Sequence, residues 1–261
     1  MTDQAPEEMT VELDGGVLRL TFRRPEVLNA MSGRMAVTLA EQLERATADD
    51  DVRVVVITGS GGSFSAGADI GGAEAHERFD VRALDAANRI IRAEVACSKP
   101  VLAAVDGVAA GVGCSVALAA DVIVASESAT FLLAFARVGL MPDGGASATV
   151  AAAIGRARAM RMALLAEPLT GLEAYDAGLV THLAGADEFD ALVDTLTRRL
   201  ASGPPLAYAA AKKAVNAATL DQLEGALERE RTGQTILLRT EDVAEGMRAF
   251  SEQRKPKFRG R

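Results

Sequence analysis

The sequence predicts an α/β fold in which short apolar strands alternate with helices, followed by a helical C-terminal region. Three observations support this. Short apolar runs recur along the chain, a turn or glycine-rich loop and a helical pattern follow most of them, and no fixed sequence period repeats. At 261 residues the chain can bury one large core. We therefore expect a core at 1–200 and a C-terminal helical region at 201–261.

Composition and charge narrow the class of protein. Hydrophobic residues make up 49% and charged residues 25% of the chain, as in ordinary globular proteins. The net charge of −8 argues against general nucleic-acid binding, although local basic groups can still bind an anion. Cys97 and Cys114 form neither a disulfide framework nor a metal-binding spacing. We expect a reduced, cytoplasmic compartment and no metal.

The sequence shows no signal for a membrane. Residues 1–8 are polar and acidic, without the basic flank and apolar run of a secretion signal. The longest apolar stretch, 101–120, contains Asp106 and several glycines, which are costly in a lone membrane span. We therefore expect no membrane partner.

The first elements follow from periodicity and end signals. Residues 17–22 alternate apolar and polar side chains, which indicates a half-buried strand, and Pro25 follows it. Ser32 is a candidate N-cap for a helix over Gly33 to Ala48. Residues 52–58 are almost wholly apolar, which predicts a strand buried on both faces.

The later elements repeat this order of strand, turn and helix. After the loop at 59–72 we expect helices and strands in alternation, and then a mostly helical chain from Phe189 with a break at Gly203-Pro204-Pro205. The expected ranges are helix 79–97, strand 101–105, helix 111–120, strand 122–125, strand 130–135, helix 144–165, strand 180–183, and helices 206–218 and 220–239.

Two glycine-rich loops each follow a predicted strand. The loop from Thr58 to Asp69 stands where a dinucleotide-binding fingerprint would, but Phe64 occupies the third glycine position and the strand is not the first of the chain. The loop from Asp106 to Cys114 leads into a helix, whose first N–H groups favour an anion. Taken alone, this second loop is explained as well or better by a tight turn between strand and helix.

The order of these loops gives them a joint meaning. Together with Arg24 to Ala30 and Gly139 to Gly145, they resemble the four landmark segments of the crotonase (enoyl-CoA hydratase/isomerase) superfamily over residues 10–255. The resemblance implies a crotonase-like spiral of ββα turns, a helical C-terminal trimerisation region and an acyl-CoA thioester substrate whose CoA is bound in bent form. It implies no separate cofactor, and a homotrimer or a dimer of trimers.

The resemblance also implies site residues. The backbone N–H groups of Ala68 and Val112 would form an oxyanion hole for the thioester carbonyl as it becomes an enolate, because preorganised donors need little rearrangement as charge develops. Backbone near Ala66, Ala68 and Ile70 would face the adenine of CoA. Arg24 would approach a phosphate or remain solvated, and Asp69 would orient the loop. The expected substrate-binding residues are Arg24, Leu28, Ala66, Ala68, Asp69, Ile70 and Val112.

The chain departs from the hydratase pattern at two positions. Hydratases of this superfamily hold water with two glutamates, and the matching positions here carry Ser115 and Phe135. Neither side chain can act as a carboxylate acid–base pair, so ordinary hydration is disfavoured.

Asp143 is the remaining acid in these segments. The stretch 131–140 is most similar to the phenylacetate-type isomerases, and Δ3,Δ2-enoyl-CoA isomerases also carry a carboxylate near this position. This predicts that Asp143 moves a proton from C2 to C4 of an enoyl-CoA, in phenylacetate or fatty-acid metabolism. Asp143 would alternatively, or additionally, N-cap a helix beginning at Gly144. A hydratase with atypical catalytic residues and a non-catalytic acyl-CoA-binding protein remain open alternatives.

Overall fold

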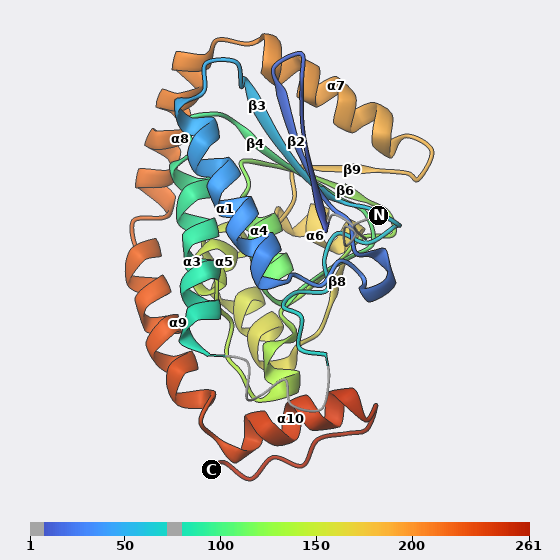
Figure 1. The fold of residues 1–261 in the computed structure, drawn as a ribbon, viewed down its shortest axis with the longest axis vertical. Coiled ribbons are helices and arrows are strands. Elements are labelled where there is room, and N and C mark those ends of the chain that lie inside the picture. Colours follow the sequence, from blue (N-terminus) through green and yellow to red (C-terminus); the bar gives the residue numbers. More distant parts are fainter. Residues whose placement is uncertain (1–7, 72–79) are drawn as a thin grey trace, which may run out of the picture.

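The computed structural model describes residues 8–71 and 80–261, and shows two sheets surrounded by helices (Figure 1). The first sheet has the strand order β1-β2-β3-β4-β6-β9, and the second has the order β5-β7-β8. Only the β1–β2 and β7–β8 pairs are antiparallel. The strands are β1 Met9–Asp14, β2 Val17–Phe22, β3 Val54–Gly59, β4 Val101–Val105, β5 Val108–Ala110, β6 Val122–Ser126, β7 Thr130–Leu132, β8 Leu169–Thr170 and β9 His182–Ala184.

Helices cover both faces of the larger sheet, and α8, α9 and α10 follow one another along the outside of the molecule (Figure 1). No helix among the described residues is long and apolar enough to cross a membrane. The helices are η1 Pro25–Val27, α1 Gly33–Ala48, α3 Val81–Ala96, α4 Gly111–Ala119, η2 Ala134–Val138, α5 Ala146–Leu165, α6 Gly171–Ala177, α7 Phe189–Ser202, α8 Pro205–Thr219, α9 Leu223–Leu237 and α10 Glu241–Ser251.

The apolar strand β3 is buried on both faces, as its sequence predicts. Val55 and Ile57 point into the main core, which α1, α3 and α4 complete. Val56 points to the opposite face and packs in a second cluster with Phe189 and Val193 of α7. Because successive side chains of a strand alternate between faces, a strand with helices on both sides has to be apolar throughout.

Several predicted elements are confirmed. The helix Gly33–Ala48 has the predicted limits, and the Ser32 hydroxyl caps it by accepting a hydrogen bond from Met35 N–H at 3.2 Å. The strand Val101–Val105 is also as predicted. The missed elements are β1, which is an exposed edge strand, the two- and three-residue strands β8 and β5, and the helices α6 and α10.

Several predicted boundaries differ from the structure, and two of these differences have a clear structural cause. The strand that starts at Thr130 ends at Leu132, where the chain turns into η2. The helix predicted to start at Gly144 starts at Ala146, because Gly144 and Gly145 have φ values of +63° and +74°, which lie outside the helical region.

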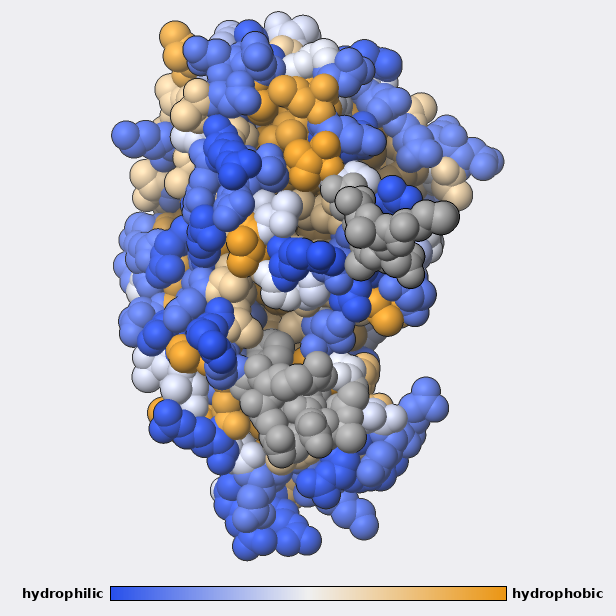
Figure 2. Space-filling view, in the orientation of Figure 1, coloured by the Kyte–Doolittle hydropathy of each residue, from blue (hydrophilic) through white to orange (hydrophobic). Residues whose placement is uncertain are grey.

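The C-terminal helices differ in how they pack. Helix α8 has no fully buried residue, and Leu206 and Val215 are 85% and 59% exposed. Helix α9 instead inserts Leu223 and Leu227 into the main core. Hydrophilic side chains cover most of the face shown in Figure 2, interrupted by smaller apolar areas. The division at residue 200 and the trimer stay predictions.

A largely buried ion pair attaches α8 to the core. Lys212 Nζ lies 2.7 Å from Asp121 Oδ2 and donates to the Glu94 carbonyl oxygen at 2.9 Å. The Glu94 carboxyl is fully buried and has no hydrogen-bond partner among the described residues. Burial raises the pKa of Glu94 well above its ordinary value, which favours the neutral form of this carboxyl beside the pair.

We expect the substitution Lys212→Met to lower the free energy of unfolding by about 3 kcal/mol, because it leaves Asp121 buried without its cation. Urea unfolding followed by circular dichroism measures the effect. The matched control is Lys213→Met, which changes the exposed neighbour on α8. Equal losses in the two variants would contradict this account of the pair.

Candidate active site

Asn29 holds the first glycine-rich loop in place. Its side chain is fully buried, and its Nδ2 donates to the carbonyl oxygens of Ser60 and Ser63 at 2.8 and 2.6 Å. Its Oδ1 accepts from Arg24 N–H at 2.8 Å. The residue has φ +56°, a left-handed conformation that asparagine tolerates better than most residues. One side chain thus joins the turn after β2 to the loop after β3.

The two glycine-rich segments lie backbone against backbone. Ser65 N–H donates to the Val108 carbonyl oxygen at 2.9 Å, and Ala110 N–H donates to the Ser65 carbonyl oxygen at 2.8 Å. A Cβ on Gly67 would lie 2.8 Å from the Ala110 carbonyl oxygen, and one on Gly113 would lie 2.7 Å from Ser65 Oγ. Glycine at these two positions is therefore required by close approach.

This packing leaves two backbone donors without partners among the described residues. Ala68 forms a parallel bridge with Met31 in which Gly67 and Met31 supply the acceptors, and no described residue accepts from the N–H of Ala68. Val112 is the second residue of α4, so its N–H precedes the first hydrogen-bonded turn of that helix. Two such donors on touching segments have the chemistry required to bind a developing oxyanion.

Asp143 is buried beside these segments. The residue is only 7% exposed, and its Oδ2 accepts from Gln234 Nε2 at 2.8 Å. Its Oδ1 is buried and has no hydrogen-bond partner among the described residues. Burial raises the pKa of Asp143 to about 7, the Gln234 donor opposes this rise, and the negative charge of Glu230 adds to it. The group can therefore exchange a proton near neutral pH.

Ser115 connects Asp143 to the first turn of α4, which bears Val112. It lies three residues after Val112 on α4, so the two residues share one helix face. Its hydroxyl donates to the Asp143 carbonyl oxygen at 2.7 Å. Phe135, at the second position where the hydratase pattern has glutamate, is buried in the main core. Neither position supplies a carboxylate.

Asp143 does not cap the helix that follows it. The N-cap of α5 is Gly145, and no side chain at that position forms a cap hydrogen bond. Glu230 of α9 accepts instead from Gly145 N–H at 2.7 Å and from Ser147 N–H at 2.9 Å. The cap alternative for Asp143 is therefore wrong, because a side chain distant in sequence has taken that role.

Sequence reasoning missed Glu230 and Gln234. They lie four residues apart on α9, so they project from one helix face. In the sequence they stand in a charged stretch that resembles any solvated helix. Their burial is visible only once α9 is placed against the turn before α5.

The predicted substrate-binding residues surround the first loop. Arg24 Nη1 lies 2.9 Å from Asp69 Oδ2 and donates to the Ala30 carbonyl oxygen at 2.7 Å, so its guanidinium is engaged within the chain. Asp69 Oδ1 accepts from Gly71 N–H at 3.3 Å. Ala66 is half-buried and donates its N–H to the Leu28 carbonyl oxygen at 2.8 Å. The side chain of Leu28 is exposed.

Ile70 is placed at the end of this loop. It packs against Val243 and Met247 of α10, so the last helix borders the segment predicted to face adenine.

Neither histidine of the chain is placed in the site. His182 is in β9, where its Nδ1 shares a hydrogen bond with Thr181 Oγ1, and His76 lies outside the described residues. Among residues 8–71 and 80–261, no group of three His, Cys, Asp or Glu side chains is arranged to hold a metal.

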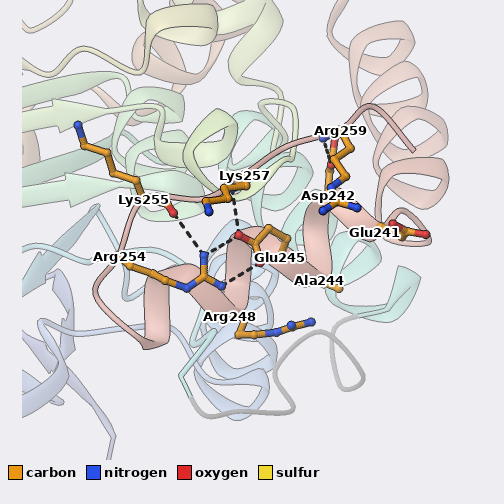
Figure 3. Close-up of a pocket in the computed structure, with 9 residues that line it drawn as sticks. All are labelled: Glu241, Asp242, Ala244, Glu245, Arg248, Arg254, Lys255, Lys257 and Arg259. Atoms are coloured by element: carbon orange, nitrogen blue, oxygen red, sulfur yellow. Dashed lines mark hydrogen bonds and ion pairs between the residues drawn. The ribbon is translucent and has the colours of Figure 1, made fainter.

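A hollow between α10 and the C-terminal tail contains none of the predicted site residues (Figure 3). Charges of both signs line it and neutralise one another. Arg254 forms two hydrogen bonds with Glu245, and Asp242 accepts from the backbone N–H groups of Arg259 and Gly260. These contacts fasten the tail to α10, which explains the hollow structurally.

Comparisons with known proteins agree with this architecture. The chain superposes with a TM-score of 0.92 on the crystal structure of an enoyl-CoA hydratase from Mycobacterium avium subsp. paratuberculosis, to which it is 48% identical. The superposition covers 97% of this chain and 99% of the other. The fold is therefore the crotonase fold. The enoyl-CoA hydratase/isomerase family model matches residues 12–261, and the chain belongs to this family of acyl-CoA enzymes.

Curated relatives carry the names of both reactions. A "probable enoyl-CoA hydratase" of Rhodobacter capsulatus is 40% identical, over 96% of this chain and 97% of the relative. The "1,2-epoxyphenylacetyl-CoA isomerase" of Escherichia coli is 35% identical, over 95% of this chain and 97% of the relative. The relatives agree on the family, but their names do not distinguish hydratase from isomerase activity for this chain.

We expect the substitution Asn29→Ala to lower the free energy of unfolding by about 3 kcal/mol, because three hydrogen bonds are lost and buried groups are left without partners. Denaturant unfolding measures the change. Asn216→Ala is the control, because among the described residues the Asn216 side chain forms a single hydrogen bond, to the Val95 carbonyl oxygen. This substitution should lower the free energy of unfolding by about 1 kcal/mol. Similar costs for both variants would show that Asn29 does not organise the loop.

Proposed function

We propose that the protein is an enoyl-CoA isomerase in which Asp143 carries the proton. The observation that supports this most is the buried carboxyl with one unpartnered oxygen, joined through Ser115 to the helix turn that bears Val112. A group of this kind can accept a proton from carbon and return it, because its pKa is near neutrality.

The proposed reaction begins with a 3-enoyl-CoA. Asp143 takes a proton from C2, and the electrons of the broken C–H bond pass into the thioester carbonyl to give a dienolate. The N–H groups of Ala68 and Val112 donate to the oxygen that gains charge. The proton then moves from Asp143 to C4, the electrons return from the oxygen, and a 2-enoyl-CoA results. No proton or electron is gained or lost overall.

A single carboxyl is sufficient for this sequence of steps. Among the described residues, Glu230 is the other acid whose charge acts on Asp143, but each of its two oxygens accepts a backbone hydrogen bond at the start of α5. It is therefore unsuited to act as the second member of an acid–base pair. This favours isomerisation over hydration.

The remaining expectations belong to this proposal. The backbone near Ala66 and the side chain of Ile70 would bind the adenine end of CoA, and Leu28 and Val112 would contact the substrate. Arg24 would bind a phosphate only by sharing a guanidinium that already pairs with Asp69. A role in phenylacetate catabolism or fatty-acid metabolism, a cytoplasmic location and a trimer or hexamer are also proposed.

Hydration is the second candidate, and the hydratase names of similar proteins favour it. Crotonyl-CoA incubated in ¹⁸O-labelled water separates the two reactions, because only hydration gives a labelled hydroxyacyl product. Binding of CoA esters without either reaction, and without exchange of the C2 proton, would instead indicate a non-catalytic binding protein.

We expect the substitution Asp143→Asn to lower kcat for 3-enoyl-CoA isomerisation by about 10³-fold, because the amide cannot accept the proton. Calorimetric affinity for a saturated acyl-CoA should change little, since the oxyanion donors are backbone groups. Asp221→Asn, at an exposed position, is the matched control. Wild-type turnover by the Asp143→Asn variant would reject the proposed function.

The rate should depend on pH in a defined direction. Asp143 must be ionised to take a proton, so kcat/KM should rise with pH through about 7 and then level off.

The raised pKa of Asp143 should also make the free energy of unfolding depend on pH. Between about pH 4 and 7, Asp143 keeps its proton in the folded protein and loses it in the unfolded chain. The stability that this group contributes at low pH is therefore lost as pH rises through 7. Urea unfolding at pH 5 and 8 should show a smaller loss of unfolding free energy between the two pH values for Asp143→Asn than for the wild type.

A further inference from the structure

We propose that Gln234 and Glu230 of α9 are positioning residues that make Oδ1 the proton-carrying oxygen of Asp143 and set the pH range in which it works. This inference rests on the proposed function, because it assigns roles around the proposed proton carrier. It adds two residues that lie about ninety positions away in the sequence and do not need to touch the substrate.

Gln234 is held at both ends of its amide. Its Oε1 accepts from Met141 N–H at 3.1 Å, and its Nε2 donates to Asp143 Oδ2 at 2.8 Å. The Met141 N–H can only donate, so it fixes which end of the amide faces Asp143. The Asp143 oxygen that receives this donor must remain an acceptor in both protonation states. A carbonyl oxygen is a better acceptor than the hydroxyl oxygen of a neutral acid, so this arrangement favours the proton on the other oxygen, Oδ1, which has no partner among the described residues.

Glu230 supplies the opposing charge. Burial raises the pKa of Glu230, and its two oxygens oppose this rise by accepting from Gly145 and Ser147 N–H at the N-terminus of α5, where the partial positive charge of a helix end stabilises an anion. Its negative charge acts on Asp143 and disfavours ionisation there. The cap of α5 thus also controls the neighbouring acid.

Among the described residues around the turn at Gly144 and Gly145, Glu230 is the charged group that acts on the ionisation of Asp143. The side chains nearest to Gly144 and Gly145 are Ser115 of α4, Ile91 of α3, and Leu223 and Leu227 of α9. These are uncharged, and Arg229 acts on Glu230 rather than on Asp143. The two α9 residues therefore have opposite effects on the same carboxyl, since the Gln234 donor favours its ionised form and Glu230 disfavours it.

Opposite shifts of the pH–rate profile test this inference. For Gln234→Met, the inflection of kcat/KM should move to higher pH by about one unit, with a lower plateau kcat and little change in KM. For Glu230→Gln, which keeps one acceptor oxygen, the inflection of kcat/KM should move to lower pH by about one unit. Gln222→Met, at the N-cap of α9, and Glu228→Gln, within α9, are exposed controls and should leave the inflection in place.

A second measurement does not depend on turnover. The ¹³C carboxyl resonance of Asp143, assigned by its loss in Asp143→Asn, should titrate with the same opposite shifts in the two variants. If Gln234→Met does not fold, Gln234→Asn, with its shorter amide, should give the alkaline shift. Shifts in one direction for both variants, or no shifts, would overturn the inference. Wild-type isomerase activity in Asp143→Asn would instead reject the proposed function, while the resonance would still report on the two positioning residues.

Discussion

The backbone-to-backbone contact between the two glycine-rich segments is the constraint on which the site depends. The pair of hydrogen bonds between residue 65 and the strand at 108–110 fixes their separation, and Gly67 and Gly113 are needed because a Cβ would force the segments apart. The two free donors are backbone groups, so their positions follow from this contact. The donors at Ala68 and Val112 do not depend on side-chain chemistry, whereas a Cβ at Gly67 or Gly113 would meet the facing segment.

A buried acid is the second constraint, and its structural support comes from a distant part of the chain. An isolated buried carboxylate is unfavourable unless hydrogen bonds or a raised pKa relieve it. Asp143 has both, because Gln234 binds one of its oxygens while burial and Glu230 favour the neutral form. Helix α9 is therefore part of the site, and the predicted division at residue 200 separates Asp143 from the two side chains that hold it.

The sequence predicts what local pattern determines and misses what long-range packing determines. The limits of α1 follow from Ser32 and the apolar period, and the crotonase fold follows from four glycine- and proline-containing segments. The cap of α5 does not follow, because its donor groups are satisfied by Glu230 from eighty-five residues away. Asn29 lies within the segment Arg24 to Ala30 that carries the resemblance, but two of its three hydrogen bonds depend on the position of the loop after β3.

The choice between the two reactions of the family depends on how many carboxyl oxygens are free near the proposed oxyanion donors. Adding water requires groups that orient it and move its protons, whereas shifting a double bond requires one group that takes a proton and returns it. Ser115 gives its hydroxyl proton to the Asp143 carbonyl oxygen, Phe135 is part of the core, and both oxygens of Glu230 cap α5. The free Oδ1 of Asp143 can accept and return a proton, but these three neighbours supply no partner to hold the water molecule that hydration needs.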